Sequence, residues 1–325
     1  MIKLFSKNIV FVLALLPLII LTNILLEIYY PTFTSTQDYI TNLWGINFNE
    51  VPVVIDKLIV ICFLTTNAVL INFTFNQHDF FERSTYLPSL IYVLLATLFP
   101  FSTSINGELF AQTFMILSIN QLFKITKQME DIRSNVFNAS ILIGIAGTFN
   151  PIYIYFLLVV FIFLIRLRPF VFREYLLAVL GIIIPFMFLW FFNQTFYKSL
   201  IFFDATLNFE KLDPIIVLVP NIITLLLLLI AYRFILIRFT KSSIRFKRLM
   251  NIVLLILLLT ISINGLLFSI FETYYYFSIG IFILAVLLPY SYLDAKLKIF
   301  SVVLIYGLIA LSIIKFFGLP SFLSI

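Results

Sequence analysis

The chain has 325 residues, of which 62% are hydrophobic and only 11% charged, and its formal net charge is +6 at pH 7. A water-soluble domain carries about a quarter charged residues, so this composition excludes a soluble globular protein. The apolar runs are continuous, without the alternation of a transmembrane β-barrel, and several reach the roughly 18 residues that cross a bilayer. We therefore expect an all-α fold: one domain over residues 1–325, formed by a polytopic transmembrane helical bundle.

The first apolar run, 9–28, follows Lys3 and Lys7 and so resembles a secretory signal. It is longer than the apolar region of such a signal and no small-residue cleavage pattern follows it, so we interpret it as a retained span. Apolar runs, caps and breakers predict about eleven transmembrane helices in all, at 9–28, 53–74, 87–105, 107–125, 135–150, 151–168, 174–192, 214–238, 250–270, 274–292 and 299–317.

The segment 135–168 is too long for a single crossing at a rise of about 1.5 Å per residue, and Asn150–Pro151 is a turn signal at its middle. Two arrangements fit these residues: two spans joined in a tight hairpin, or a re-entrant pair. Before the turn, Ser140, Gly144 and Thr148 recur at every fourth residue, a spacing that predicts close packing of a neighbouring helix.

The basic residues predict the orientation. With a cytoplasmic N-terminus, 17 of the 21 Lys and Arg residues fall in cytoplasmic segments, the exceptions being Lys57, Lys198, Lys211 and Lys315. This is the positive-inside bias of a multi-pass protein. It predicts a multi-pass membrane protein with an external C-terminus, and a basic internal loop at 238–249. Lys315 and Glu27 are expected to reach toward the outer interface.

Orientation also accounts for the positive charge, so we expect no nucleic-acid partner. The expected partners are the lipid bilayer and, at the cytoplasmic face, anionic lipid headgroups, with envelope proteins as further candidates. Two basic stretches would attract those headgroups: the first includes Arg166, Arg168 and Arg173, and the second is KSSIRFKR at 241–248.

Metal and redox chemistry find little support in the sequence. His78 is the only histidine and Cys62 the only cysteine, so we expect no metal site and no cofactor. His78 is expected to be solvated or to cap a helix. The predicted spans carry no charged residue at the bilayer midplane, and their amides are expected to bond between helices or, alternatively, to line a polar groove: Asn67, Gln112, Asn120 and Asn264.

The first predicted external loop, YYPTFTSTQDYITNLWGINFNE (29–50), supplies a candidate catalytic residue. A carboxylate held at the membrane surface, such as Asp38, is placed to act as a general base, or to hold a divalent metal against a lipid-linked phosphate. Polytopic glycosyltransferases that use polyprenyl-phosphate sugars are similar in placing an acidic residue after a first span. That similarity is architectural only.

Two short motifs place Arg and Glu side by side at predicted helix starts, in NQHDFFERSTYLPSLIY (76–92) and RLRPFVFREYLLAVLGIIIPF (166–186). Glu82 and Arg83 in the first, with Arg173 and Glu174 in the second, are the candidate substrate-binding residues. Ordinary helix starts explain the same residues: Ser84 or Thr85 as a cap, Asp79 paired with Arg83, and an acid at the positive helix end.

The same motifs resemble a family of uncharacterised multi-pass inner-membrane proteins of Bacteroidota, over most of the chain. The positions that carry the resemblance are Glu82, Arg83, Pro88, Arg173, Glu174, Gly181 and Pro185. The resemblance implies a multi-pass inner-membrane protein and carries no activity with it.

Three functions are compatible with these patterns. The first is a non-catalytic component of cell-envelope assembly, favoured by short loops and by the lack of a catalytic cluster. The second is a glycosyltransferase-like enzyme that uses a polyprenyl-phosphate-linked sugar at the external face, through Asp38. The third is a flippase or transporter of an amphiphilic substrate.

Overall fold

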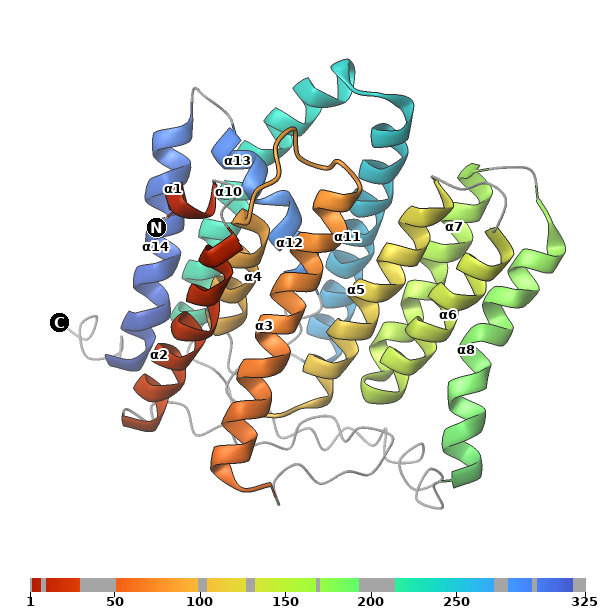
Figure 1. The fold of residues 1–325 in the computed structure, drawn as a ribbon, viewed down its shortest axis with the longest axis horizontal. Coiled ribbons are helices and arrows are strands. Elements are labelled where there is room, and N and C mark those ends of the chain that lie inside the picture. The colour runs from red at the N-terminus through yellow and green to blue at the C-terminus, as the bar shows by residue number, and fades with distance from the viewer. Residues whose placement is uncertain are drawn as a thin grey trace.

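The computed structural model describes residues 2–6, 10–29, 51–98, 104–126, 132–167, 170–192, 214–271, 280–293 and 297–317. In these ranges every regular element is a helix, as the sequence predicts (Figure 1). The elements are α1 (Ile2–Phe5), η1 (Val10–Ala14), α2 (Leu15–Tyr29), α3 (Val53–Gln77), α4 (Leu87–Leu98), α5 (Gly107–Ile125), α6 (Ile132–Phe149), η4 (Pro151–Phe156), α7 (Leu157–Leu167), α8 (Phe172–Phe192), α10 (Pro214–Lys241), α11 (Ile244–Phe271), α12 (Ile281–Leu287), α13 (Pro289–Leu293), α14 (Lys298–Ile314) and η6 (Lys315–Phe317).

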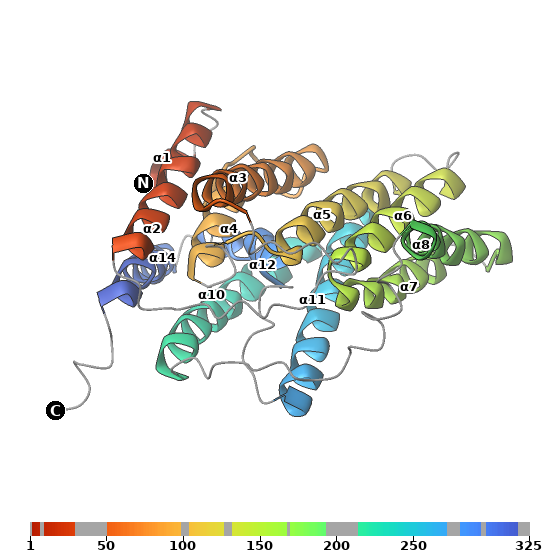
Figure 2. The same ribbon diagram turned by 90° about the horizontal axis from the view of Figure 1, so that it is seen from below.

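Each predicted helix has a counterpart in this order, with η1 continuing into α2, η4 into α7, and α12 into α13. Within the described ranges, five helices are long and apolar enough to cross a membrane, and they are Val10–Tyr29, Val53–Gln77, Phe172–Phe191, Val219–Lys241 and Ile244–Ile263. Consecutive long helices run antiparallel (Figure 1), and the bundle is elongated, with α2 and α14 at one side and α8 at the other (Figure 2).

Helix α4 lies inside the bundle. All twelve of its residues are buried, and it packs against α2, α3, α12 and α14. Its sequence, LPSLIYVLLATL, is apolar on every side, which is the pattern of a helix without a solvent-facing surface. The helix ends at Leu98, so the predicted end at 105 is wrong. Ser104 and Ile105, the next residues that the structure describes, are not helical.

The basic segment predicted as an internal loop at 238–249 is also different in the structure. Helix α10 continues to Lys241 and α11 begins at Ile244, so only Ser242 and Ser243 lie between them. The hydroxyl of Ser243 accepts a hydrogen bond of 3.3 Å from the backbone N–H of Phe246. This bond satisfies one of the free donors at the start of α11 and explains how the helix can begin in a charged stretch.

Helices α6 and α8 pack backbone to backbone. A Cβ on Gly144 would lie 2.9 Å from the carbonyl oxygen of Ile182 and 3.0 Å from Cγ of Pro185. Reciprocally, a Cβ on Gly181 would lie 2.8 Å from Cβ of Ser140. The predicted packing role of the small residues on α6 is therefore confirmed, and their neighbour is α8.

The chain turns between α6 and η4 at Asn150–Pro151. The Asn150 side chain accepts a hydrogen bond from the backbone N–H of Ile152, and Pro151 occupies the first turn of η4. Helix α6 has 18 residues, a length of about 27 Å. Asn150 also contacts Glu108 in the first turn of α5, so the turn lies at the end of the bundle and not at half its depth. This geometry matches the predicted hairpin.

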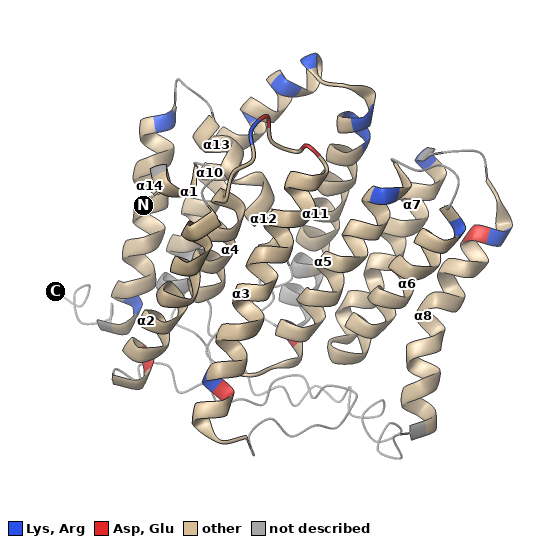
Figure 3. Ribbon diagram, viewed as in Figure 1, with Lys and Arg blue, Asp and Glu red and all other residues tan. Residues whose placement is uncertain are grey.

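Most Lys and Arg residues gather at one end of the bundle, where α3 connects to α4, α7 to α8, and α10 to α11 (Figure 3). We call this the basic end. At the opposite end α3 and α5 begin, and α6 turns into η4.

Candidate functional site

The structure places the predicted site residues apart. Asp38 lies outside the described residues. Glu82 and Arg83 are exposed on the loop between α3 and α4, whereas Arg173 is exposed in the first turn of α8 and Glu174 beside it is only 1% exposed. All four lie at the basic end. However, α8 packs on α6 and α7 and lies at the far side of the bundle from α4 (Figures 1 and 2), so the two Arg–Glu pairs do not share one site.

The loop between α3 and α4 is closed by Asn76. Its amide nitrogen donates to the carbonyl oxygen of Thr85 at 3.0 Å, and its amide oxygen accepts from the backbone N–H of Thr85 at 3.4 Å. The Thr85 hydroxyl accepts from the N–H of Leu87, which confirms that Thr85 caps α4. Asp79 adopts a positive φ of 59° within this closed loop, a conformation that Asp tolerates better than most residues.

His78 is the C-terminal cap residue of α3, one of its two expected roles, but its side chain is buried and not solvated. Its Nε2 lies 3.1 Å from Oδ1 of Asn120, and its Nδ1 lies 3.4 Å from a guanidinium nitrogen of Arg245. Because a guanidinium can only donate, Nδ1 is the acceptor, and the proton on Nε2 is donated to Asn120.

Arg245 also forms an ion pair of 3.9 Å with Asp79, so the predicted pairing of Asp79 with Arg83 is wrong. The tertiary partner comes from α11, far along the chain. Among the described residues, Glu82 and Arg83 make no hydrogen bond or ion pair.

A polar network that the sequence did not reveal lies at the opposite end, around Glu108. The hydroxyl of Tyr153 donates to Glu108 Oε1 at 2.6 Å, and the amide nitrogen of Asn150 donates to Oε2 at 2.7 Å. The amide nitrogen of Gln112 donates to Oε1 at 3.1 Å. Hydrogen bonds to a carboxylate are stronger than those between neutral groups, so this residue connects α5 firmly to the hairpin turn.

The network continues into the interior through fully buried groups. The hydroxyl of Tyr92 on α4 donates to the amide oxygen of Gln112 at 2.6 Å and accepts from the amide nitrogen of Asn67 at 3.2 Å. The amide oxygen of Asn67 accepts from the Thr113 hydroxyl at 2.6 Å. We call these seven residues the Glu108 network: Asn67, Tyr92, Glu108, Gln112, Thr113, Asn150 and Tyr153.

Asn67 and Gln112 were predicted either to bond between helices or to line a groove. In the structure they are buried and connected through Tyr92. Asn120 instead accepts the hydrogen bond from His78 near the basic end. The side chain of Asn264 lies outside the described residues. The sequence motif that could have indicated this network is NPIY at 150–153. Its Asn150 and Tyr153 side chains donate hydrogen bonds to Glu108, the acidic residue in the first turn of α5.

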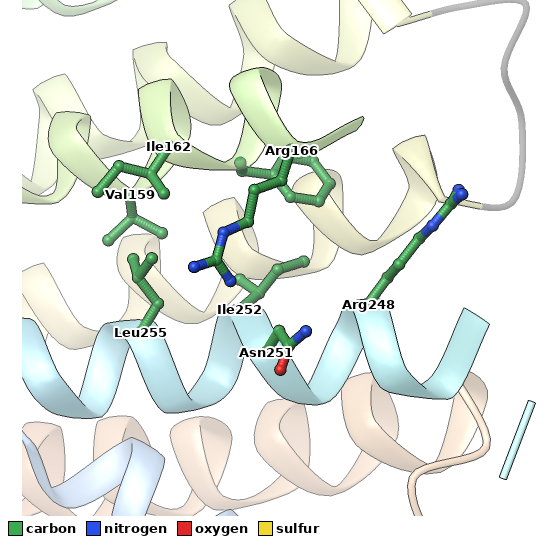
Figure 4. A pocket seen from close by; sticks show the side chains of 8 residues that line it. Val159, Ile162, Arg166, Arg248, Asn251, Ile252 and Leu255 are labelled. Carbon is green, nitrogen blue, oxygen red and sulfur yellow. The ribbon is translucent and has the colours of Figure 1, made fainter. Parts of the chain in front are cut away.

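A second feature is a cavity of about 240 Å³ between α7 and α11 (Figure 4). Arg166, Arg248 and Asn251 form its polar lining. In Figure 4 the Arg166 side chain reaches from α7 toward α11, where the Asn251 amide lies, while Arg248 points away from the centre. The apolar lining consists of Val159, Ile162, Phe163, Ile252 and Leu255.

Lys315, which was expected to reach toward the outer interface, has a buried side chain at the end of the bundle opposite the basic end. It is 5% exposed, and its ammonium group donates to the carbonyl oxygen of Thr97 in the last turn of α4. A cation at a helix C-terminus satisfies a free carbonyl and opposes the negative end of the helix dipole.

Among the described residues, no group of three or more His, Cys, Asp or Glu side chains is arranged to hold a metal ion. Comparison of the chain with protein-family models, with curated proteins and with solved structures gives no match.

Proposed function

We propose that this chain is a multi-pass protein of the bacterial inner membrane that serves as a non-catalytic component of cell-envelope assembly. The bonding of the Glu108 network is the observation that carries the proposal. Both oxygens of Glu108 accept hydrogen bonds from side chains of its own protein. A general base needs a lone pair directed at its substrate, whereas this carboxylate is used to hold α5 against η4.

The interior supports the same function. α4 is buried along its whole length, and the amides of Asn67 and Gln112 satisfy each other through Tyr92. Polar groups that bind one another in this way stabilise contacts between helices. A transport path would instead need such groups to face a substrate.

The sidedness is part of the proposal. The basic end in Figure 3 would face the cytoplasm, in keeping with the positive-inside bias. The N-terminus would then be cytoplasmic and the C-terminus external.

Complementation of a deletion strain tests the function. We expect the deletion to make the cell envelope permeable, measured as uptake of an impermeant dye, and the wild-type gene to restore the barrier. A scaffold predicts that Asp38→Asn and Glu108→Gln complement whenever their membrane abundance equals that of the wild type.

An Asp38→Asn variant of wild-type abundance that fails to complement would contradict the scaffold and favour the enzyme at the external face. A deletion strain with an intact barrier would contradict a role in the envelope altogether.

A further inference from the structure

The cavity between α7 and α11 combines basic groups at its mouth with an apolar interior. Arg166 is the last-turn basic residue of α7, and Arg248 lies near the start of α11. Both helices therefore bring arginine to the basic end, although they run in opposite directions along the bundle (Figure 1).

The apolar lining lies deeper on both helices. Ile162 and Val159 precede Arg166 by four and seven residues, and Ile252 and Leu255 follow Arg248 by four and seven. These spacings place each set on one face of its helix, one to two turns from the arginine. The lining thus changes from cationic to apolar in the same sense as a bilayer leaflet changes from headgroup to chain.

Both arginine side chains are available to bind a ligand. Arg166 and Arg248 are exposed, and within the described part of the chain neither has a carboxylate or hydrogen-bond partner. Two other arginines at this end are engaged with their own protein, since Arg245 is held by His78 and Asp79, and Arg238 lies over the ring of Phe246 at 4.7 Å. Asn251 adds an amide to the lining of the cavity, on the helix toward which the Arg166 side chain reaches (Figure 4).

We propose that this cavity binds the phosphate headgroup of an anionic glycerophospholipid, with one acyl chain against Val159, Ile162, Ile252 and Leu255. A guanidinium and an amide donor in the same lining match phosphate oxygens, and basic pockets between transmembrane helices are known sites for anionic headgroups. A free phosphate ion would use the arginines but not the apolar lining. The cavity is smaller than the roughly 300–1,000 Å³ of a pocket for a drug-sized ligand, which suits a headgroup and the start of one chain.

The test uses the full chain purified in an uncharged detergent. Phosphatidylglycerol, phosphatidylcholine with the same acyl chains, and inorganic phosphate are titrated separately, and binding is measured as the rise in the midpoint of thermal denaturation. We expect phosphatidylglycerol to raise the midpoint, and the other two to have little effect, because one lacks net charge and the other lacks a chain.

Substitutions locate the binding. Arg166→Gln is expected to weaken binding of phosphatidylglycerol by about tenfold or more, the usual effect of losing a charge-assisted hydrogen bond. Arg248→Gln is expected to weaken it less, since that side chain points away from the centre. The matched control is Lys298→Gln, which removes one exposed positive charge from α14, at the other side of the bundle, and should bind as the wild type does.

Three results would overturn the proposal: equal binding by Arg166→Gln and the wild type, equal binding of phosphatidylcholine and phosphatidylglycerol, or an inorganic phosphate effect as large as that of the lipid. Should Arg166→Gln not fold, Asn251→Leu provides the same test from α11. All of these measurements use purified protein, so they are independent of the envelope function proposed above.

Discussion

The hydroxyl of Tyr153 donates a hydrogen bond of 2.6 Å to Glu108 Oε1, across 45 residues of sequence. This bond joins η4, just after the Asn150–Pro151 turn, to the first turn of α5. Through Gln112 and Tyr92 the same carboxylate is connected to the buried helix α4. The position of the hairpin in the bundle thus depends on a few polar side chains.

The first prediction concerns this bond. Tyr153→Phe removes one hydroxyl and leaves a carboxylate oxygen with fewer donors, so we expect a loss of about 1–2 kcal/mol in stability. The measurement is the midpoint of thermal denaturation in detergent. Tyr155→Phe is the matched control, because Tyr155 lies in the same short helix but is 58% exposed. Equal effects of the two substitutions would contradict a structural role for the network.

The second prediction concerns the contact of α6 with α8. Gly144→Ala should destabilise the protein by about 1–3 kcal/mol, because the new Cβ would lie 2.9 Å from the Ile182 carbonyl oxygen. Gly307→Ala is the control, since its Cβ would meet only Ile223 Cδ1 at 3.7 Å. There, the better helix propensity of Ala should leave stability unchanged or raise it. A Gly144→Ala protein as stable as the wild type would show that this packing is looser than described.

The third prediction concerns the end of α4. Lys315→Met keeps the length of the side chain but removes the donor to the Thr97 carbonyl oxygen, and we expect a loss of about 1–2 kcal/mol. Arg83→Met, at an exposed position of the loop between α3 and α4, should change stability by no more than about 0.5 kcal/mol. Thermal denaturation of both variants side by side checks the difference. If both behave alike, the buried lysine contributes nothing as a helix cap.

The order of the helices could be predicted because each apolar run is bounded by charges or breakers, and because helices are the way a membrane-spanning segment satisfies its backbone. The close packing of a neighbouring helix on α6 could also be predicted, since the small residues Ser140 and Gly144 share a face. The ends were less certain. α4 is helical to Leu98 and Ile105 is not helical, and α11 begins within the charged stretch because Ser243 caps it.

The Glu108 network could not be predicted from the sequence, for a different reason. Hydropathy does not say which face of an apolar helix meets which neighbour, so the convergence of Tyr92, Glu108 and Tyr153 could not be foreseen. His78 was expected to be solvated or to cap a helix, and it does end α3, but its burial could not be foreseen because Asn120 and Arg245 come to it from distant helices.

The central claim is that the chain crosses the membrane with its basic end in the cytoplasm, and labelling of single cysteines tests it most directly. In a Cys62→Ser background, Ser84→Cys places an exposed thiol on the loop between α3 and α4, and Val53→Cys places one at the start of α3. With a membrane-impermeant maleimide on spheroplasts, the account predicts that Val53→Cys is labelled and that Ser84→Cys is labelled only after the membrane is opened. Labelling of Ser84→Cys in intact spheroplasts, with Val53→Cys protected, would contradict it.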